Sequence, residues 1–337
     1  EKQTNLVPPA RFVSAKKLLL SPKAPYCLKC ARCLNARMIL KIEHTWRQEF
    51  KRLEGAYAPS TMRAYYADLE IYTRWCAESN RVPFPGSVET VCAFLIHQSP
   101  ELAPSTVRRR IYAIRKVHEL LRLPDPTQDE DINLPFRRTL RSKTSRPRQA
   151  KGMTRDYLER FLAVQPDSPW GLRDKAMLSM GYDLLARRSE LVALRVEDVE
   201  HRADGTLRVL IRRSKTDPAG FGRVAFTSKR TARLVADWLE WRSRDFRPLF
   251  CPIYQGHCLD RHLSDTSVKH LVKSAAKNAG LHTNEVENFS GHSMRVGAAQ
   301  DLLKAGHDTA AIMRAGGWKS INVLTRYLEN AESNVWL

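Results

Sequence analysis

A set of cationic, aromatic and carboxylate residues in the C-terminal half of the sequence has the composition of a phosphate-handling site. The stretch SGHSMRVGAA (290–299) places His292 and Arg295 three residues apart, so we expect both on one face of a helix. Lys215 follows a strand-like segment, and Tyr327 lies near the end of the sequence. The same set includes Arg187, Arg188 and Glu190 in LLARRSELVAL, and Trp318 in AGGW.

These residue types suit attack on a phosphodiester. Planar guanidinium groups such as that of Arg295 can hold the two non-bridging oxygens and the charge that develops on them. A tyrosine hydroxyl can act as the nucleophile and form a covalent phosphotyrosine. A lysine can protonate the leaving oxygen, while imidazole and indole N–H groups donate to the same phosphate. Because the cations are built in, we expect no metal and no cofactor.

Each residue alone also has an ordinary structural interpretation. Tyr327 could be a core or surface aromatic residue, and Lys215 a lysine in a turn. The His292–Arg295 pair could serve as a cap or an interhelical bond. Residues 298–328, with Gly306 in a turn between two helical segments, could also form a helix-turn-helix of a non-enzymatic DNA-binding protein.

Composition indicates a polyanionic partner. The 337 residues contain 56 Lys plus Arg against 36 Asp plus Glu, a formal net charge of +20, and nucleic acid is the commonest partner of such a protein. No apolar run is long enough to span a membrane. Cys27, Cys30 and Cys33 could join His44 in a metal site, but we expect free thiols in a reducing cytosol.

Periodicity divides the chain into four segments. We expect an arm at 1–42, an all-helical domain at 43–135, a basic linker at 136–153 and a mainly helical domain at 154–337 that contains a β-hairpin after Asp204–Gly205. The helix that begins near 104 has an apolar stripe and an opposite basic face, which we expect to contact phosphates. The basic face comprises Arg108, Arg109, Arg115 and Lys116.

The order and spacing of these motifs resemble the tyrosine recombinase (phage integrase) family. The resemblance rests on SGHSMRVGAAQDLLKAG, AGGW at 315–318, LLARRSELVALRVEDV, RRSKTDPAG and Tyr327, and it continues in weaker form from about 43. It implies that Tyr327 is the nucleophile and Lys215 the general acid. It further implies that Arg187 is the first arginine, Glu190 its supporting carboxylate, His292 and Arg295 a His-x-x-Arg pair, Trp318 a further donor and Arg188 a DNA contact.

The resemblance also implies a fold and a function. We expect a mainly α protein with a small β-sheet, whose helical core-binding domain and catalytic domain form a C-shaped clamp around DNA. The implied enzyme is a site-specific recombinase that cleaves and rejoins duplexes through a 3′-phosphotyrosyl intermediate and a Holliday junction. It would act as a homotetramer on two sites with inverted-repeat half-sites, in the cytoplasm of a prokaryote and of phage or plasmid origin. A type IB topoisomerase is the alternative enzyme.

Overall fold

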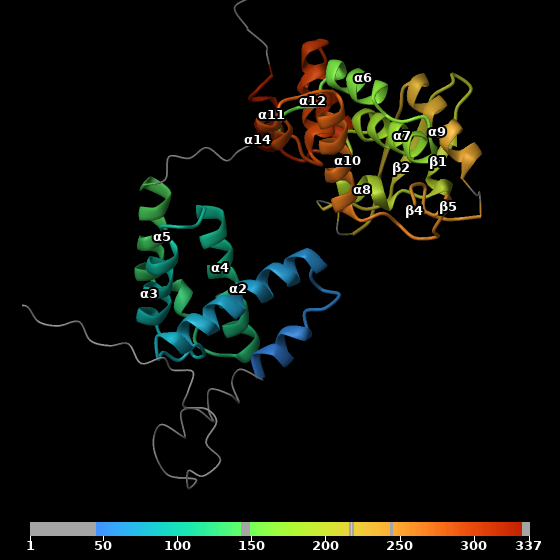
Figure 1. Ribbon diagram of the computed structural model, residues 1–337. Coiled ribbons are helices and arrows are strands. Elements are labelled where there is room, and N and C mark those ends of the chain that lie inside the picture. The colour runs from blue at the N-terminus through green and yellow to red at the C-terminus, as the bar shows by residue number, and fades with distance from the viewer. Residues whose placement is uncertain (1–44, 143–148, 216, 218, 243–244, 332–337) are drawn as a thin grey trace, which may run out of the picture. The chain divides into compact units, whose positions relative to one another are not determined.

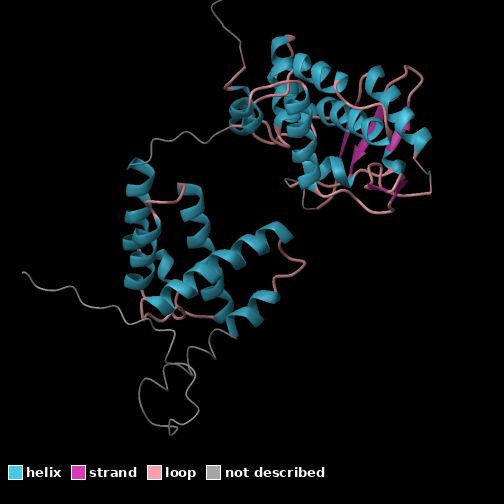
Figure 2. Cartoon of the chain, viewed as in Figure 1, coloured by secondary structure: helices cyan, strands magenta, loops and turns pink. Residues whose placement is uncertain are grey.

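The computed structural model describes residues 45–142, 149–215, 217, 219–242 and 245–331 (Figure 1). The chain divides into two compact units, with the boundary between Arg146 and Pro147. Helices dominate both units, and the strands among the described residues lie in the second (Figure 2). The expected mainly α fold with a small sheet is therefore confirmed. The cysteines at 27, 30 and 33 and the expected arm at 1–42 lie outside the described residues.

The N-terminal unit is helical throughout its described part, as predicted. The expected apolar stripe of α4 supplies the core: Val107, Ile111, Ile114 and Val117 are all buried. Pro104 occupies the first turn of α4, where a missing N–H costs nothing. Besides a helical segment at 45–51, the elements are α2 (Pro59–Glu78), α3 (Val88–Gln98), α4 (Pro104–Leu121), the 3₁₀ turn η2 (Pro126–Gln128) and α5 (Glu130–Ser142).

The segment expected to be a linker is partly structured. Residues 136–142 belong to α5, which continues past Pro135 because its apolar face, including Ile132, packs in the core of this unit. At the other end, the Lys151 N–H donates to the Asn288 carbonyl at 2.8 Å and the Met153 N–H to the Ser293 carbonyl at 2.8 Å. The division between the two units lies within the expected linker, and tertiary packing orders both ends of that segment.

The C-terminal unit contains the remaining helices and both small sheets. Its first helices are α6 (Arg155–Ala163), α7 (Pro169–Asp183) and the short α8 (Arg188–Ala193), followed by the 3₁₀ turn η3 (Val196–Asp198). After the strands come α9 (Lys229–Trp241), α10 (Asp265–Asn278), α11 (Thr283–Asn288), α12 (Ser293–Lys304), α13 (Thr309–Gly316) and α14 (Ile321–Leu328).

The predicted hairpin is present and is extended by one strand. β2 (Leu207–Ile211) pairs antiparallel with β3 (Arg223–Phe226), with Val209 opposite Ala225. β1 (Val199–His201), which sequence alternation did not reveal, pairs with the other edge of β2. A two-stranded ribbon, β4 (Ile253–Tyr254) and β5 (His257–Cys258), is separate from this sheet.

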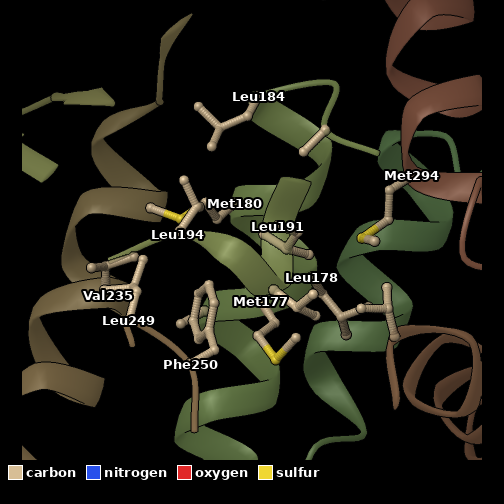
Figure 3. Packing of buried hydrophobic residues seen from close by; sticks show 14 of the residues in the cluster. Met177, Leu178, Met180, Leu184, Leu191, Leu194, Val235, Leu249, Phe250 and Met294 are labelled. Atoms are coloured by element: carbon tan, nitrogen blue, oxygen red, sulfur yellow. The ribbon is translucent and has the colours of Figure 1, made fainter. Parts of the chain in front are cut away.

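Small residues allow α12 to lie in the interior. Figure 3 shows Met294 of α12 directed into the core beside Leu191 and the α7 residues. A Cβ added at Gly181 of α7 would stand 2.5 Å from the Met294 sulfur, and one at Gly297 would stand 2.0 Å from the Met153 carbonyl oxygen. Glycine at 181 lets α7 and α12 approach closely, and glycine at 297 lets α12 lie against the backbone of Met153.

No helix in the described part of the chain has the length and apolar character needed to cross a bilayer.

Candidate active site

Arg295 is a fully buried cation on α12, with none of its side chain exposed. One of its terminal nitrogens, Nη1, donates to the carbonyl of Leu185, at the end of α7. Its Nε and Nη2 have no hydrogen-bond partner among the described residues. A buried guanidinium with free donors is costly unless an anion binds there. This arginine therefore indicates an anion site rather than a structural ion pair.

Two aromatic side chains cover Arg295. Its guanidinium carbon lies 3.8 Å from the ring centroid of Trp318 and 5.6 Å from that of Tyr327. The two rings meet edge to face, with centroids 5.1 Å apart. The Trp318 indole nitrogen is buried and also lacks a partner within the described residues, whereas the Tyr327 side chain is half-buried. The predicted nucleophile and the predicted donors are thus neighbours.

The α12–α14 region brings these residues together for a simple reason. Leu324 of α14 and Ile312 of α13 are buried in one apolar cluster with Ala298 and Ala299 of α12. The amide of Gln300 donates to the Tyr327 carbonyl at 3.3 Å, which ties α14 to α12. Amphipathic packing of α14 therefore sets the position of the tyrosine.

Arg187 and Glu190 form an ion pair at the start of α8. The Glu190 carboxylate accepts from Arg187 Nη1 at 2.6 Å and from the Arg187 backbone N–H at 3.1 Å. The glutamate side chain is only 1% exposed. Arg188 turns elsewhere and pairs with Asp265 of α10 at 3.1 Å. Glu190 therefore pairs with Arg187, the arginine three residues before it, as the spacing predicted, and not with Arg188.

Arg223 is a member of this cluster that sequence reasoning missed. Its Nη1 donates to the Ala315 carbonyl at 2.7 Å, and its Nη2 to the Leu184 carbonyl at 2.9 Å and to Glu190 at 3.5 Å. It thereby connects α7, α8 and the turn that carries Trp318. Arg223 lies on the same inward face of β3 as Ala225, and this position could have indicated its role. The inward face of β3 can be identified only when the strand register is known.

The interior of the site has an excess of positive charge. Glu190 is the carboxylate in contact with both Arg187 and Arg223, and Arg295 is buried beside them. Burial, followed by repulsion from Arg187, lowers the pKa of Arg295 to about 10, and burial also lowers the pKa of Arg223. Both groups stay protonated at neutral pH, so the positive charges of the cluster outnumber the single negative charge of Glu190. A phosphodiester would supply further negative charge.

Lys215 and His292 lie at the accessible side of the cluster. Lys215 is exposed in the connection between β2 and β3, four residues beyond the end of β2 rather than directly at the strand end. His292 is the N-cap residue of α12 and is also exposed, while Arg295 points inward. The expected His292–Arg295 pair therefore separates into an outer and an inner member, although the two remain close enough to interact electrostatically.

The pKa of His292 is lowered from its ordinary value of 6.5, first because neighbouring groups displace water from part of the ring, and then because cations surround it. These cations are Arg188, Arg295, Arg187 and Lys215. At pH 6.5 half of the unfolded chains carry the extra proton, and a smaller fraction of the native rings does. Stability from this group is therefore complete above pH 6.5 and is lost as the pH falls towards the lowered pKa.

We expect acidification from about pH 7 to about pH 5 to reduce the free energy of unfolding less in His292→Gln than in the wild-type protein. Urea titrations at both pH values measure the difference. NMR titration of the ring should further show its pKa rising when DNA binds, because a phosphate offsets the surrounding cations. An unchanged His292 pKa on DNA binding would mean that no phosphate reaches this ring.

The predicted basic face of α4 is less free than expected. Arg109 forms two hydrogen bonds with Asp68 of α2, at 2.6 and 3.0 Å, and Arg115 contacts Thr127 and Asp125. Lys116 pairs with Glu119. Arg108 lies over the ring of Phe136, with its guanidinium carbon 5.0 Å from the ring centroid. These residues stabilise their own unit, and their role in DNA contact remains a prediction.

No cluster of three metal-binding side chains occurs within the described ranges. The residues that carry charge at the site are basic, apart from Glu190, which is already bonded to Arg187. The donor set suits an anionic oxygen and does not suit a divalent cation.

Comparison with known proteins gives related sequences along most of the chain. Residues 151–334, more than half of the sequence, match the profile of the phage integrase family. Recombinase cre of Escherichia phage P1 is 27% identical over 298 residues, covering 82% of this chain and 86% of that protein. An integrase/recombinase xerD homolog of Selenomonas ruminantium is 29% identical over 306 residues, covering 88% of this chain and 86% of the relative.

Solved structures share the fold. XerH site-specific recombinase bound to difH substrate, in a pre-cleavage complex, superposes with a TM-score of 0.58 at 18% identity, covering 79% of this chain and 74% of that one. A lambda integrase(75–356) dimer bound to a COC′ core site gives 0.56 at 15% identity, covering 86% and 96%. At these identities the likeness is one of fold.

The catalytic-unit fold, and the guanidinium groups gathered beside Tyr327, define an enzyme of the tyrosine recombinase class. The relatives carry the names of recombinases and integrases, so the non-enzymatic helix-turn-helix alternative is not supported. With its profile match over 151–334, the chain belongs to the phage integrase family.

Proposed function

We propose that this protein is a site-specific recombinase that cleaves and rejoins duplex DNA through a covalent 3′-phosphotyrosyl intermediate. The observation that carries this proposal is the group of unpartnered donors beside the Tyr327 ring: Nε and Nη2 of Arg295 and the Trp318 indole N–H. These N–H groups could donate hydrogen bonds to the non-bridging oxygens of one phosphate at the place where the tyrosine can attack it.

The chemistry proceeds by two balanced displacements. The Tyr327 hydroxyl passes its proton to the His292 imidazole or to water as its oxygen bonds to phosphorus, while the bond from phosphorus to the 5′-oxygen breaks. Lys215 gives a proton to that leaving oxygen. In the reverse direction, a 5′-hydroxyl from another strand attacks the phosphotyrosine and releases the tyrosine. One phosphoester bond replaces another at each step, so the reaction requires neither ATP nor a metal.

Recombination requires an assembly larger than one chain. We propose a homotetramer on two sites, each with inverted-repeat half-sites, in which strands exchange in pairs through a Holliday junction. The N-terminal unit would act as the core-binding domain and close a clamp around the duplex with the catalytic unit. The XerH and lambda integrase structures, both bound to DNA, support this assignment. The protein would work on the DNA of a prokaryotic cytoplasm, on behalf of a phage or plasmid.

A plasmid with two copies of the target site separates the recombinase from the type IB topoisomerase alternative. Footprinting on the DNA next to the protein's own gene defines the site. The recombinase should convert a plasmid with two directly repeated sites into two circles, and should leave a one-site plasmid as a single circle. Relaxation of both plasmids without any new circles would favour the topoisomerase.

Lys215→Ala should slow cleavage by about 10²-fold or more while changing DNA affinity little, because the leaving alkoxide then lacks a proton donor. The rate is measured as the appearance of covalent adduct. A substrate with a bridging 5′-sulfur should restore it, since a thiolate leaves without protonation. The exposed Lys229→Ala variant is the control for loss of charge. If the sulfur substrate gave no rescue, Lys215 would only hold phosphate.

A further inference from the structure

Phe221 is the most exposed of the large apolar side chains in the described part of the protein. Its side chain is 91% exposed, in the connection between β2 and β3 that also carries Lys215. Full exposure of a phenyl ring in water gives no stability to the folded chain. A ring held in this position on a functional loop therefore suggests a contact that is made only with a partner.

Hydrogen bonds and glycine conformations fix the described residues on either side of this ring. The carboxylate of Asp217 accepts hydrogen bonds from the N–H of Phe221 at 3.2 Å and from that of Gly222 at 2.7 Å. Gly220 and Gly222, on either side of the ring, have φ of +77° and +73°, which favour glycine. A Cβ on Gly222 would also stand 3.0 Å from the Ile211 carbonyl oxygen. Local structure thus directs the ring outward.

The surroundings of the ring are basic. Arg213 and Lys215 are exposed in the same connection, whereas Arg212 pairs with Asp198 and Glu197. Lys319 lies close enough to Asp217 to lower the pKa of that carboxyl, after the larger effect of the backbone hydrogen bonds. An apolar tip within a basic surface matches a partner with anionic edges and an apolar interior. Duplex DNA, with phosphates outside and stacked bases inside, has this chemistry.

We infer that Phe221 acts as an apolar wedge that enters the minor groove and partly unstacks one base step beside the cleaved linkage. The inference rests on the proposed function, because Lys215 brings this loop to the leaving oxygen. Phe221 is the sixth residue after Lys215, so a ring inserted into the groove would hold the adjacent phosphate in place for the lysine. Phe221 is thus a positioning residue for the cleavage step.

The test uses 2-aminopurine, whose fluorescence rises when the base is unstacked. It replaces each adenine of the footprinted site in turn, and the full-length protein carries Tyr327→Phe so that no cleavage disturbs the reading. In this background, protein that keeps Phe221 and the Phe221→Leu variant should both raise the fluorescence at one base step. The Phe221→Ala variant should not. Affinity should fall about tenfold in Phe221→Ala. The salt dependence of binding should not change, because no phosphate contact is lost.

Phe226→Ala is the matched control. This ring is also exposed, at 53%, but lies on β3 with the guanidinium of Arg202 over it, 5.1 Å from its centroid. Its removal should leave the fluorescence and affinity unchanged. If the fluorescence rise persisted in Phe221→Ala, the wedge would be overturned. It would also be overturned if Phe221→Ala lost only the assembly between copies of the chain. If the protein with intact Tyr327 unstacked the base step but never formed a covalent adduct with DNA, the proposed function would be overturned and the wedge would stand.

Discussion

Tyr327→Phe should bind the target duplex with wild-type affinity and form no covalent adduct. Phenylalanine keeps the edge-to-face contact with Trp318, at 5.1 Å between centroids, and the position over Arg295. Only the hydroxyl is lost, and with it the one atom that can bond to phosphorus. The packing that ties α14 to α12 is preserved, so the variant should fold as the wild type does.

The adduct is measured by denaturing gel electrophoresis of end-labelled DNA, with binding followed in parallel by mobility shift. Tyr182→Phe is the matched control, because Tyr182 is a half-buried tyrosine of the same unit whose hydroxyl bonds to Asp301 at 2.6 Å. It should form adduct normally. Covalent product from Tyr327→Phe would show that another residue is the nucleophile and would remove the central step of the proposed reaction.

Arg295→Lys should reduce the rate of cleavage by about 10²- to 10³-fold, the effect typical of removing a single transition-state donor. Lysine retains a positive charge, but its ammonium cannot reproduce the planar fork that now presents Nε and Nη2 without partners. The bond from Nη1 to the Leu185 carbonyl can be replaced in part by the ammonium. The loss should therefore appear in catalysis more than in folding.

Single-turnover cleavage at saturating protein measures this rate, and thermal unfolding checks the fold. Arg314→Lys, an exposed arginine of α13, is the control and should cleave at the wild-type rate. A reduction of less than tenfold in Arg295→Lys, with the fold intact, would mean that charge alone suffices at this position. The buried unpartnered nitrogens would then need another explanation.

The sequence was most informative where a property depends on local order. The amphipathic period of α4 predicted its buried face, and motif spacing predicted a cluster in which Arg295, Trp318 and Tyr327 do lie together. Glu190 could be assigned to Arg187 because the partners are three residues apart on one short helix. In the α4 and Glu190 cases the relevant neighbours are close along the chain, whereas the Arg295, Trp318 and Tyr327 cluster joins separate elements and was expected from the order of the motifs and the family resemblance.

Properties that depend on distant partners could not be predicted. The Asp68 carboxylate that engages Arg109 is 41 residues away on another helix, so the basic face of α4 looked freer than it is. Arg223 joins the site through backbone carbonyls at the ends of α7 and α13. Every residue has a backbone carbonyl, so the sequence does not indicate which of them accept hydrogen bonds. Residues 136–142 have a basic, linker-like composition, yet they continue α5 because its apolar face is covered by α3 and α4.

The aromatic cover over Arg295 has a consequence for the resting enzyme. With the indole 3.8 Å from the guanidinium carbon, and the remaining donors buried, inorganic phosphate and sulfate from solution cannot reach these nitrogens without displacing Trp318 or Tyr327. Gly316 and Gly317 precede the tryptophan, and Gly317 has a φ of +66°, so this turn is the place where such a displacement can begin. If these donors bind the scissile phosphate, this turn must shift when a duplex docks, and a small anion in solution would have to cause the same displacement by itself.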